Sequence, residues 1–405
     1  MRGRIAVENV SKKSGIRPWL PFLIFPFFNP TGLKYISGLK ILYDGIQIWK
    51  LCACIIIWVI YLRRNRVSKF WLLCFSFQGV LIIASLINGV YDSKIITNML
   101  IATSLVMMTE ICVCSCFNEY INQLWRIDAT LVFVNFLLAI VFPKGLRFAT
   151  LYKSTTNPLF FLGIDNALAS QLIPFIFLAT LKWAMNVRGK KQRNNLKLAG
   201  AYIIALATLM IAGSATGIFV VAVFIILSIQ FTFIKRGRIP YKLAIGVYAF
   251  FFIVIIVLQS NNFIVGFISG LLGRSATFTG RSLLWRMAID EILKKPFLGY
   301  GYTAGNIDVW GGMFSSHNMF LEILLQGGLF SFGLFIAITL FSIKRNIKSP
   351  IWLSNTVFLA IFCMLLKGLM EVSIPTFYYV IITIAYDAPY LMKQYNERKE
   401  NIVFP

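Results

Sequence analysis

The sequence predicts an all-α integral membrane protein with about twelve transmembrane helices and one long outer loop that contains an amphipathic helix. Hydrophobic residues make up 58% of the chain and charged residues 13%, and the mean hydropathy is +0.77. A soluble domain would carry about a quarter charged residues. Apolar runs of about 20 residues recur along the whole chain, which is the length that a membrane-spanning helix needs. Since no stretch is long and polar enough for a soluble unit, residues 1–405 form a single polytopic membrane domain.

Twelve apolar segments are long enough to be helical spans, and helices satisfy their own backbone hydrogen bonds in lipid. They cover about residues 19–36, 42–62, 70–90, 95–116, 125–142, 165–186, 197–213, 215–234, 242–259, 318–342, 351–371 and 374–392. Pro21, Pro26 and Pro30 interrupt the first segment. We therefore expect a broken or re-entrant helix there.

Lysine and arginine predict the orientation. If both termini are cytoplasmic, the inner segments hold most of the 39 basic residues, as the positive-inside rule requires. The net charge of +24 then follows from topology and from anchoring against anionic lipid, and nucleic-acid binding is not expected. The basic N-terminus lacks the apolar core and small-residue site of a cleaved signal peptide.

All seven cysteines fall inside predicted spans, so no disulfide framework is expected. Cys112, Cys114 and Cys116 lie close in sequence, but on a helix only the first and last share a face. No histidine or carboxylate joins them in sequence, so packing is favoured over a metal site, and we expect no metal ion.

The long outer loop, residues 259–317, contains an amphipathic helix. Thr279 is a suitable N-cap, and Pro296 ends the helix after about four turns. Leu284, Ala288 and Glu291 mark one largely apolar face, which suits a helix lying against the bundle or the bilayer surface.

Arg281 occupies the first turn of this predicted helix. A cation there opposes the helix dipole unless an anion binds at the same end, where free backbone N–H groups and a guanidinium make a phosphate site. A solvated interfacial arginine explains the position equally well. After the helix, Gly299 and Gly301 allow a tight turn beside a ligand, which we expect Tyr300 and Tyr302 to contact.

His317 is the only histidine of the chain and opens the span that follows the loop. Its side chain is the usual proton acceptor near neutral pH, although a polar helix cap is the alternative. Asn318, Glu322 and Gln326 follow at intervals of four and form a polar stripe that faces the bundle interior or a wet cavity. Glu322 could orient or balance charge in a site, or make an interhelical hydrogen bond.

These residues carry a family pattern. Gly280-Arg281 with Trp285, then Pro296 through Gly301, then His317-Asn318 leading to Gly327-Gly328, resembles the shared C-terminal motif of the O-antigen polymerase and O-antigen ligase superfamily. The resemblance covers about 50–60 residues, and its specificity rests on the ordered combination of the motifs.

The resemblance implies a multispanning glycosyltransferase at the outer face of the bacterial inner membrane. Its donor would be an oligosaccharide on undecaprenyl diphosphate, and its product an O-antigen, capsule or exopolysaccharide. It implies no cofactor, and it implies membrane lipid and a chain-length regulator protein as partners. By the same resemblance, His317 and Arg281 match the family's essential residues.

One position departs from the family pattern. Many members carry a Ser-Arg pair at the outer turn before the loop, whereas this chain has Ser214-Ala215. A second diphosphate contact must therefore come from elsewhere, and Arg147, Lys153 and Arg274 are the candidates. Asn166 is a further candidate substrate contact, since it lies in a stretch loosely like another family motif.

Three functions compete. Polymerisation of lipid-linked repeat units is the first choice, and ligase-type transfer of a glycan to another acceptor is the second. A lipid-linked oligosaccharide transporter is the alternative from another class, because Glu110, Lys367 and Asp387 lie in predicted spans. Transporters often contain inverted repeats, and no internal repeat is visible here.

Overall fold

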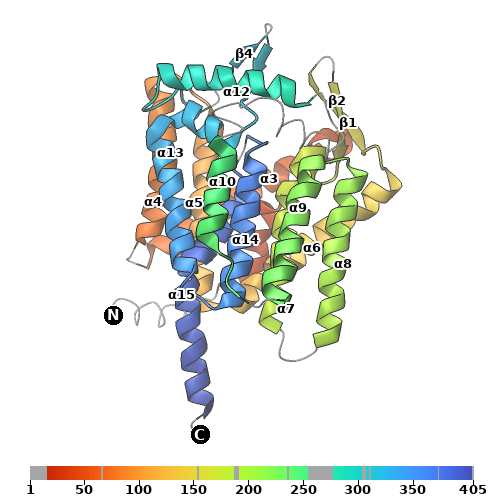
Figure 1. The fold of residues 1–405 in the computed structure, drawn as a ribbon, viewed down its shortest axis with the longest axis vertical. Coiled ribbons are helices and arrows are strands. Elements are labelled where there is room, and N and C mark those ends of the chain that lie inside the picture. The colour runs from red at the N-terminus through yellow and green to blue at the C-terminus, as the bar shows by residue number, and fades with distance from the viewer. Residues whose placement is uncertain are drawn as a thin grey trace.

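The structure is a computed structural model that describes residues 16–64, 67–152, 155–186, 191–234, 237–253, 277–302, 307–309, 312–372 and 374–403. Long helices dominate it (Figure 1). They are α3 (Lys40–Leu62), α4 (Lys69–Ile87), α5 (Ser93–Ser115), α6 (Phe117–Val141), α7 (Asp165–Asn186), α8 (Lys191–Ile211), α9 (Ala215–Ser228), η5 (Ile229–Ile234), α10 (Tyr241–Phe252), α12 (Thr277–Lys294), α13 (Met319–Asn346), α14 (Ile351–Gly368) and α15 (Thr376–Val403).

The expected helical membrane architecture is confirmed in its class. Within the described residues, seven helices are long and apolar enough to cross a membrane, and three shorter apolar helices lie at 195–211, 215–231 and 241–250. The number of twelve spans stays a prediction. The protein is therefore membrane-embedded. Most of its exposed large hydrophobic side chains lie on helices, where they can contact lipid.

The proline-rich first segment is broken, as its sequence indicates. It consists of η1 (Arg17–Trp19), α2 (Leu20–Ile24), η2 (Phe25–Phe27), η3 (Thr31–Tyr35) and η4 (Ser37–Leu39). At its far end, the Thr31 hydroxyl donates to the carbonyl of Leu162 (3.0 Å) and the Gly32 N–H donates to that of Phe161 (3.0 Å). These bonds replace part of the ladder that prolines remove from a helix.

Hydrogen bonds tie helix ends together at both ends of the bundle. At one end Arg17 donates to the carbonyl of Ser115 (3.3 Å) and Arg238 to that of Ser349 (2.8 Å). At the other, Lys295 donates to Asn88 (2.7 Å). Figure 1 shows α12 lying across this second end, roughly at right angles to the other helices, whereas α15 projects from the first end.

Two small antiparallel sheets lie in the connections and were not expected from the sequence. The first joins β1 (Arg147–Tyr152), β2 (Thr155–Phe160) and β3 (Gly163–Ile164) in that order. The second joins β4 (Ile307–Val309) and β5 (Gly312–Phe314). β3, β4 and β5 have only two or three residues each, too few for a recognisable alternation of polar and apolar residues.

Helix α12 is amphipathic, but it begins earlier than its sequence suggests. Trp285 and Ala288 are buried on one face, whereas Arg286 and Asp290 are exposed on the other. The helix starts at Thr277, two residues before the expected N-cap Thr279. Arg281 is therefore its fifth residue, and the expectation that it occupies the first turn is wrong.

Helix α13 is interrupted at Gly328, which has φ 60° and ψ −161° inside an otherwise helical segment. The turn after α12 fills this break with four backbone hydrogen bonds. Tyr300 N–H and Gly301 N–H donate to the carbonyls of Leu325 (2.7 Å) and Gln326 (2.9 Å), and the N–H groups of the two residues after Gly328 donate to the carbonyls of Pro296 (2.8 Å) and Phe297 (3.3 Å). Irregular backbone at membrane depth requires such partners.

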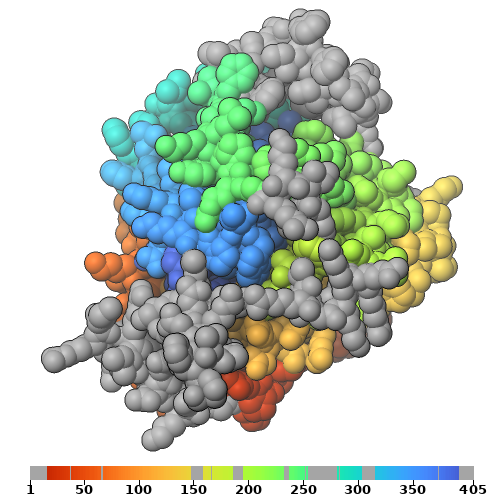
Figure 2. All heavy atoms as spheres, turned by 60° about the horizontal axis from the view of Figure 1, so that its bottom comes forward, coloured from red at the N-terminus to blue at the C-terminus, as the bar shows by residue number. Residues whose placement is uncertain are grey.

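Helix α10 covers the region where α13 and α14 meet. Figure 2 shows it in green against the blue surface of those helices. Tyr248 of α10 packs on Phe320 of α13, with ring centroids 5.9 Å apart, and its hydroxyl donates to the carbonyl of Leu365 in α14 (3.0 Å). This packing keeps the first turn of α13 inside the protein.

Glu110, one of the intramembrane charges that favoured a transporter, belongs to a closed network. Its two oxygens accept hydrogen bonds from the Tyr61 hydroxyl (2.6 Å) and the Ser68 hydroxyl. The network joins α3, α4 and α5, so it has a structural explanation.

Candidate functional site

His317 lies in a strained turn directly before α13. Its φ is 49°, and among the described residues it is the one non-glycine residue in the left-handed region. Asn318, not His317, is the N-cap, because its side-chain oxygen accepts from the N–H groups of Phe320 (2.9 Å) and Leu321 (3.0 Å). The capping role proposed as the alternative for the histidine is therefore filled by its neighbour. Backbone strain of this kind persists only where the surroundings impose it.

The residues that flank His317 impose that turn. The buried Ser316 donates through its hydroxyl (2.9 Å) and its backbone N–H (3.3 Å) to Glu322, one turn inside α13. Gln326 donates to the other oxygen of Glu322 (2.9 Å). The polar stripe of α13 thus fastens the chain on one side of His317, and the Asn318 cap fastens it on the other.

The turn between α14 and α15 connects His317 to Arg281. The Asn318 amide donates to the carbonyl of Leu369 (3.1 Å), and a guanidinium nitrogen of Arg281 lies 3.3 Å from the sulfur of Met370. This turn, of which residues 369–372 and 374–375 are described, therefore holds α12 and the start of α13 at one place, although their residues lie far from it in sequence.

The electrostatics agree with this proximity. Burial lowers the pKa of His317 below its usual 6.5, and the positive charge of Arg281 lowers it further. An imidazole with a depressed pKa is neutral at physiological pH and can accept a proton. The structure thus brings together Arg281 and His317, which sequence reasoning had paired without a geometric argument.

Glu371 is a third charged member of the site, and sequence reasoning missed it. Burial raises the pKa of its carboxyl group, whereas the positive charges of Lys367 and Arg281 oppose that shift, and Asp165 adds to it. The carboxyl group therefore interacts electrostatically with both cations. Its position at the end of the span 351–371, four residues from Lys367, was the available signal.

Lys367 is buried in the last turn of α14, with 2% of its surface exposed. It interacts electrostatically with Glu371. It is the second cation that the described residues bring to the site, and it had been considered only as a feature of a transporter. A buried cation of this kind requires a charged partner, which Glu371 supplies.

A cavity of about 470 Å³ lies beside this cluster, within the size range of small-ligand pockets. Glu322, Gln326 and Tyr302 line it near the His317 turn, and Val372 lines it next to Glu371. One face of α5, from Ile95 to Met108, forms a wall, which corresponds to a depth of about 20 Å at 1.5 Å per residue. The cavity therefore reaches from the site into the bundle.

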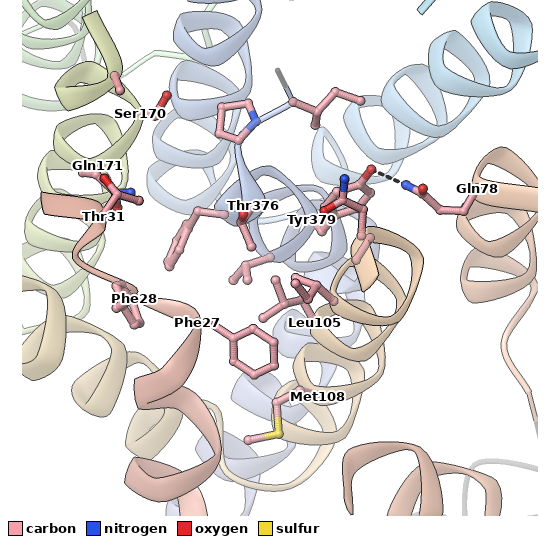
Figure 3. A pocket seen from close by; sticks show the side chains of 18 of the residues that line it. Phe27, Phe28, Thr31, Gln78, Leu105, Met108, Ser170, Gln171, Thr376 and Tyr379 are labelled. Atoms are coloured by element: carbon pink, nitrogen blue, oxygen red, sulfur yellow. Dashed lines mark hydrogen bonds between the residues drawn. The ribbon is translucent and has the colours of Figure 1, made fainter. Parts of the chain in front are cut away.

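Polar and apolar side chains separate within this cavity. Figure 3 shows Ser170, Gln171, Thr31, Thr376, Gln78 and Tyr379 in its upper part. Phe27, Phe28, Leu105 and Met108 lie below them in the same view. The broken first segment supplies both phenylalanines, so its departure from a regular helix shapes the cavity.

The two tyrosines of the turn after α12 differ in position. Tyr302 lines the cavity and accepts a hydrogen bond from Asn98 (2.8 Å). Tyr300 does not line it; its hydroxyl donates to Glu291 (2.7 Å), and its ring lies under the ammonium group of Lys295 (4.8 Å). The nearby glycines pack against α4 and α13, so the tight turn serves the bundle as well as the cavity wall.

The remaining candidates are placed only in part. Arg147 lies in β1, and Asn166 lies in the first turn of α7 beside Asp165. Lys153 and Arg274 lie outside the described residues. Among the described residues, no group of three or more His, Cys, Asp or Glu side chains could hold a metal ion.

Comparison with known families agrees with the sequence motifs. Residues 200–336 match a family model described as O-Antigen ligase. The matched segment includes α12, Arg281, His317 and the break in α13, and it ends before Lys367 and Glu371. The resemblance to the O-antigen polymerase and ligase superfamily is thereby confirmed over these residues. No curated protein matches the chain.

Proposed function

We propose that this membrane-embedded protein is a glycosyltransferase that polymerises undecaprenyl-diphosphate-linked oligosaccharide repeat units at the outer face of the cytoplasmic membrane. The observation that carries the proposal is the pairing of a partly buried, neutral His317 with the guanidinium of Arg281 beside a cavity. The family match over residues 200–336 supports chemistry of the polymerase or ligase type.

The reaction needs one base and one anion-stabilising group. A hydroxyl oxygen of the acceptor sugar attacks the anomeric carbon of the donor as its proton passes to His317. The bond from that carbon to the diphosphate oxygen breaks, and the diphosphate leaves with the electron pair. Attack opposite the leaving group inverts the anomeric centre. Such a base contributes about 10²–10⁴-fold to the rate.

Arg281 stabilises the charge that develops on the diphosphate. A preorganised donor of this kind is worth a few kcal/mol in a site that excludes water, roughly 3 kcal/mol in measured cases. Glu371 is proposed as a positioning residue, because it interacts electrostatically with Arg281. The positive charge of Lys367 opposes the effect of burial on Glu371 and so favours its ionised form.

Ligase-type transfer is the second candidate, because the matched family is described as O-Antigen ligase. Both reactions use the same donor and the same base. An assay with purified membranes separates them. Lengthened undecaprenyl-linked products indicate a polymerase, whereas label that moves to a different acceptor indicates a ligase.

The test of the proposed function uses His317→Ala and Arg281→Ala in a strain that lacks the gene. Each variant should lose the long glycan chains while its membrane level matches that of the wild type. The matched control is Arg286→Ala, because Arg286 is an exposed residue of the same helix. Long chains of normal length from the His317→Ala strain would rule out His317 as the base. Long chains of normal length from the Arg281→Ala strain would rule out the role of Arg281 in stabilising the phosphate.

A further inference from the structure

The ionisable residues that line the cavity are unusual for an enzyme that acts on lipid diphosphates. Among the described residues that line it, there is no lysine, arginine or histidine, and Glu322 is the one ionisable carboxylate. The guanidinium of Arg281 is also absent from this lining. A phosphate group would therefore enter the cavity against an acidic group, and none of the described lining residues is a cation that could bind it.

Several polar side chains of the cavity wall still have hydrogen-bonding capacity. Within the part of the chain that the structure describes, Ser170, Gln171 and Thr376 have no side-chain hydrogen-bond partner, and all three line the cavity. Gln78 donates to the Tyr379 hydroxyl (2.8 Å), which leaves its amide oxygen available as an acceptor. Ser170 and Gln171 are half-buried, and Thr376 is exposed. A ligand that covers these groups must supply hydrogen-bond partners for them, which favours a ligand with hydroxyl or amide groups.

Aromatic side chains complete the wall below these groups. Figure 3 shows Phe27 and Phe28 beneath Thr31 and Gln171. A mostly apolar pocket with a few convergent polar groups is typical of sites for small uncharged molecules. A sugar ring suits this lining, because its hydroxyl groups lie around the rim and its C–H groups form apolar faces.

The two substrates differ in where they carry phosphate. The reacting carbon of the donor is bonded directly to the diphosphate, so this end must lie near Arg281. The reacting hydroxyl of the acceptor belongs to the end of the glycan that is farthest from its own diphosphate. Of the two reacting ends, only the acceptor end can fill this cavity without bringing phosphate to a lining whose described residues include no cation.

We propose that this cavity binds the terminal sugar of the acceptor glycan and that this sugar is uncharged. The inference rests on the proposed glycosyl transfer and adds the chemical class of the acceptor end. Glu322 connects the two parts of the site, because it lines the cavity and also holds Ser316 beside His317. The acceptor hydroxyl therefore enters from the cavity side of the histidine.

The first test is a comparison of glycan linkages with and without the gene. In the deletion strain, single repeat units accumulate on the lipid, and one hydroxyl that is free there becomes substituted in the wild-type polymer. Methylation analysis of both products identifies the sugar that carries this hydroxyl. We expect a sugar without carboxyl, phosphate or sulfate groups.

An acidic sugar at this position would overturn the inference and leave the proposed function intact. A polymer that forms equally well without the gene would instead overturn the proposed function. The two failures are thus distinguishable in one experiment.

The second test measures the purified enzyme with lipid-linked donor and, as acceptor, the phosphate-free repeat oligosaccharide released from the lipid by mild acid. Gln171→Leu should raise the half-saturating acceptor concentration about tenfold, as expected for one lost hydrogen bond. The maximal rate and the half-saturating donor concentration should be unchanged. The matched control is Gln123→Leu, on α6 and outside the cavity lining.

An unchanged requirement for acceptor in Gln171→Leu, or a change confined to the donor, would overturn the assignment of the cavity to the acceptor. A wild-type enzyme that elongates no glycan under these conditions would count against the proposed function instead.

Discussion

At the scale of single residues, the strained turn at His317 explains how a histidine at the start of a helix can serve as a base. Asn318 supplies the cap, and Ser316 is tied to Glu322, so the imidazole does not have to satisfy the backbone of α13. Sequence reasoning identified the residue, but it could not separate the two roles, because both place a polar side chain at the same position.

The titration of His317 can be measured directly, because it is the only histidine of the chain. We expect the NMR signal of ¹³C-labelled histidine, in protein with a histidine-free tag, to titrate with a midpoint below 6.5. Arg281→Gln should move this midpoint upward, since it removes a positive charge that disfavours the imidazolium.

Transfer activity should follow the same group. A base must be deprotonated, so the rate should fall as pH falls through the pKa of His317 and should level off above it. A midpoint above 6.5, or one that Arg281→Gln leaves unchanged, would contradict the electrostatic coupling of these two residues.

Glu371 and Lys367 allow stability to be separated from activity. Glu371→Gln should destabilise the protein by about 3 kcal/mol, because a buried cation loses its charged partner. The double variant Lys367→Met/Glu371→Gln should recover most of that loss in a thermal unfolding experiment in detergent. Both variants should stay impaired in glycan transfer, because Arg281 has lost its charged neighbour.

The double variant decides between two roles for Glu371. Recovery of stability together with wild-type transfer would mean that Glu371 serves only to neutralise Lys367. No sequence motif marked either residue for this site, since their relation to Arg281 depends on the path of the α14–α15 turn.

At the scale of elements, the break in α13 and the turn after α12 form one interlocked unit. Two N–H groups of the turn donate to carbonyls of the broken helix, and two N–H groups of the helix donate to carbonyls of the turn. These bonds satisfy backbone groups that the break leaves without helical partners. The glycine pair 327–328 was visible in the sequence as the end of a motif, but the helix break at Gly328, which lets the turn after α12 bond to the flanking backbone, was not.

This interlock predicts a sharp difference between two glycines of α13. Gly328→Ala should lower the unfolding midpoint and abolish transfer, because alanine at φ 60° costs about 1–2 kcal/mol and its Cβ would collide with the carbonyl group of Phe297. Gly333→Ala, on the same helix with open space at the Cβ position, is the matched control and should be neutral or slightly stabilising. Equal behaviour of the two variants in thermal unfolding and glycan assays would argue against the interlock.

Helix α12 shows the limit of local boundary signals. Its apolar face and its end before Pro296 follow the sequence pattern. Its start does not follow the pattern. Thr279 could cap the helix, but the helix begins two residues earlier, at Thr277. The anion-binding role of Arg281 therefore rests on its side chain near His317, rather than on free N–H groups in its own turn.

At the scale of the whole molecule, the basic residues predict the orientation in the membrane, and this orientation decides on which side of the membrane the site lies. If both termini are cytoplasmic, α12 and the His317 turn face outward. Leu293→Cys, an exposed position on α12, should react with a membrane-impermeant maleimide in intact spheroplasts.

The matched position is Lys348, an exposed residue at the opposite end of the bundle. Lys348→Cys should react only after the membrane is permeabilised, and the native cysteines of the parent protein set the background. The reverse labelling pattern would place the site on the cytoplasmic side and exclude a role in surface polysaccharide assembly.

The sequence by itself determined the membrane class and the order of the long helices, and it singled out His317 and Arg281 as candidate site residues. These follow from properties that are local along the chain: the length of the apolar segments, the placement of lysine and arginine, and a motif whose residue spacing can be read from the sequence. The cavity, the broken first segment as its wall, and the Lys367–Glu371 pair depended on the tertiary structure. Each brings together residues from separate helices, and packing between such helices selects their neighbours only once the whole bundle has formed.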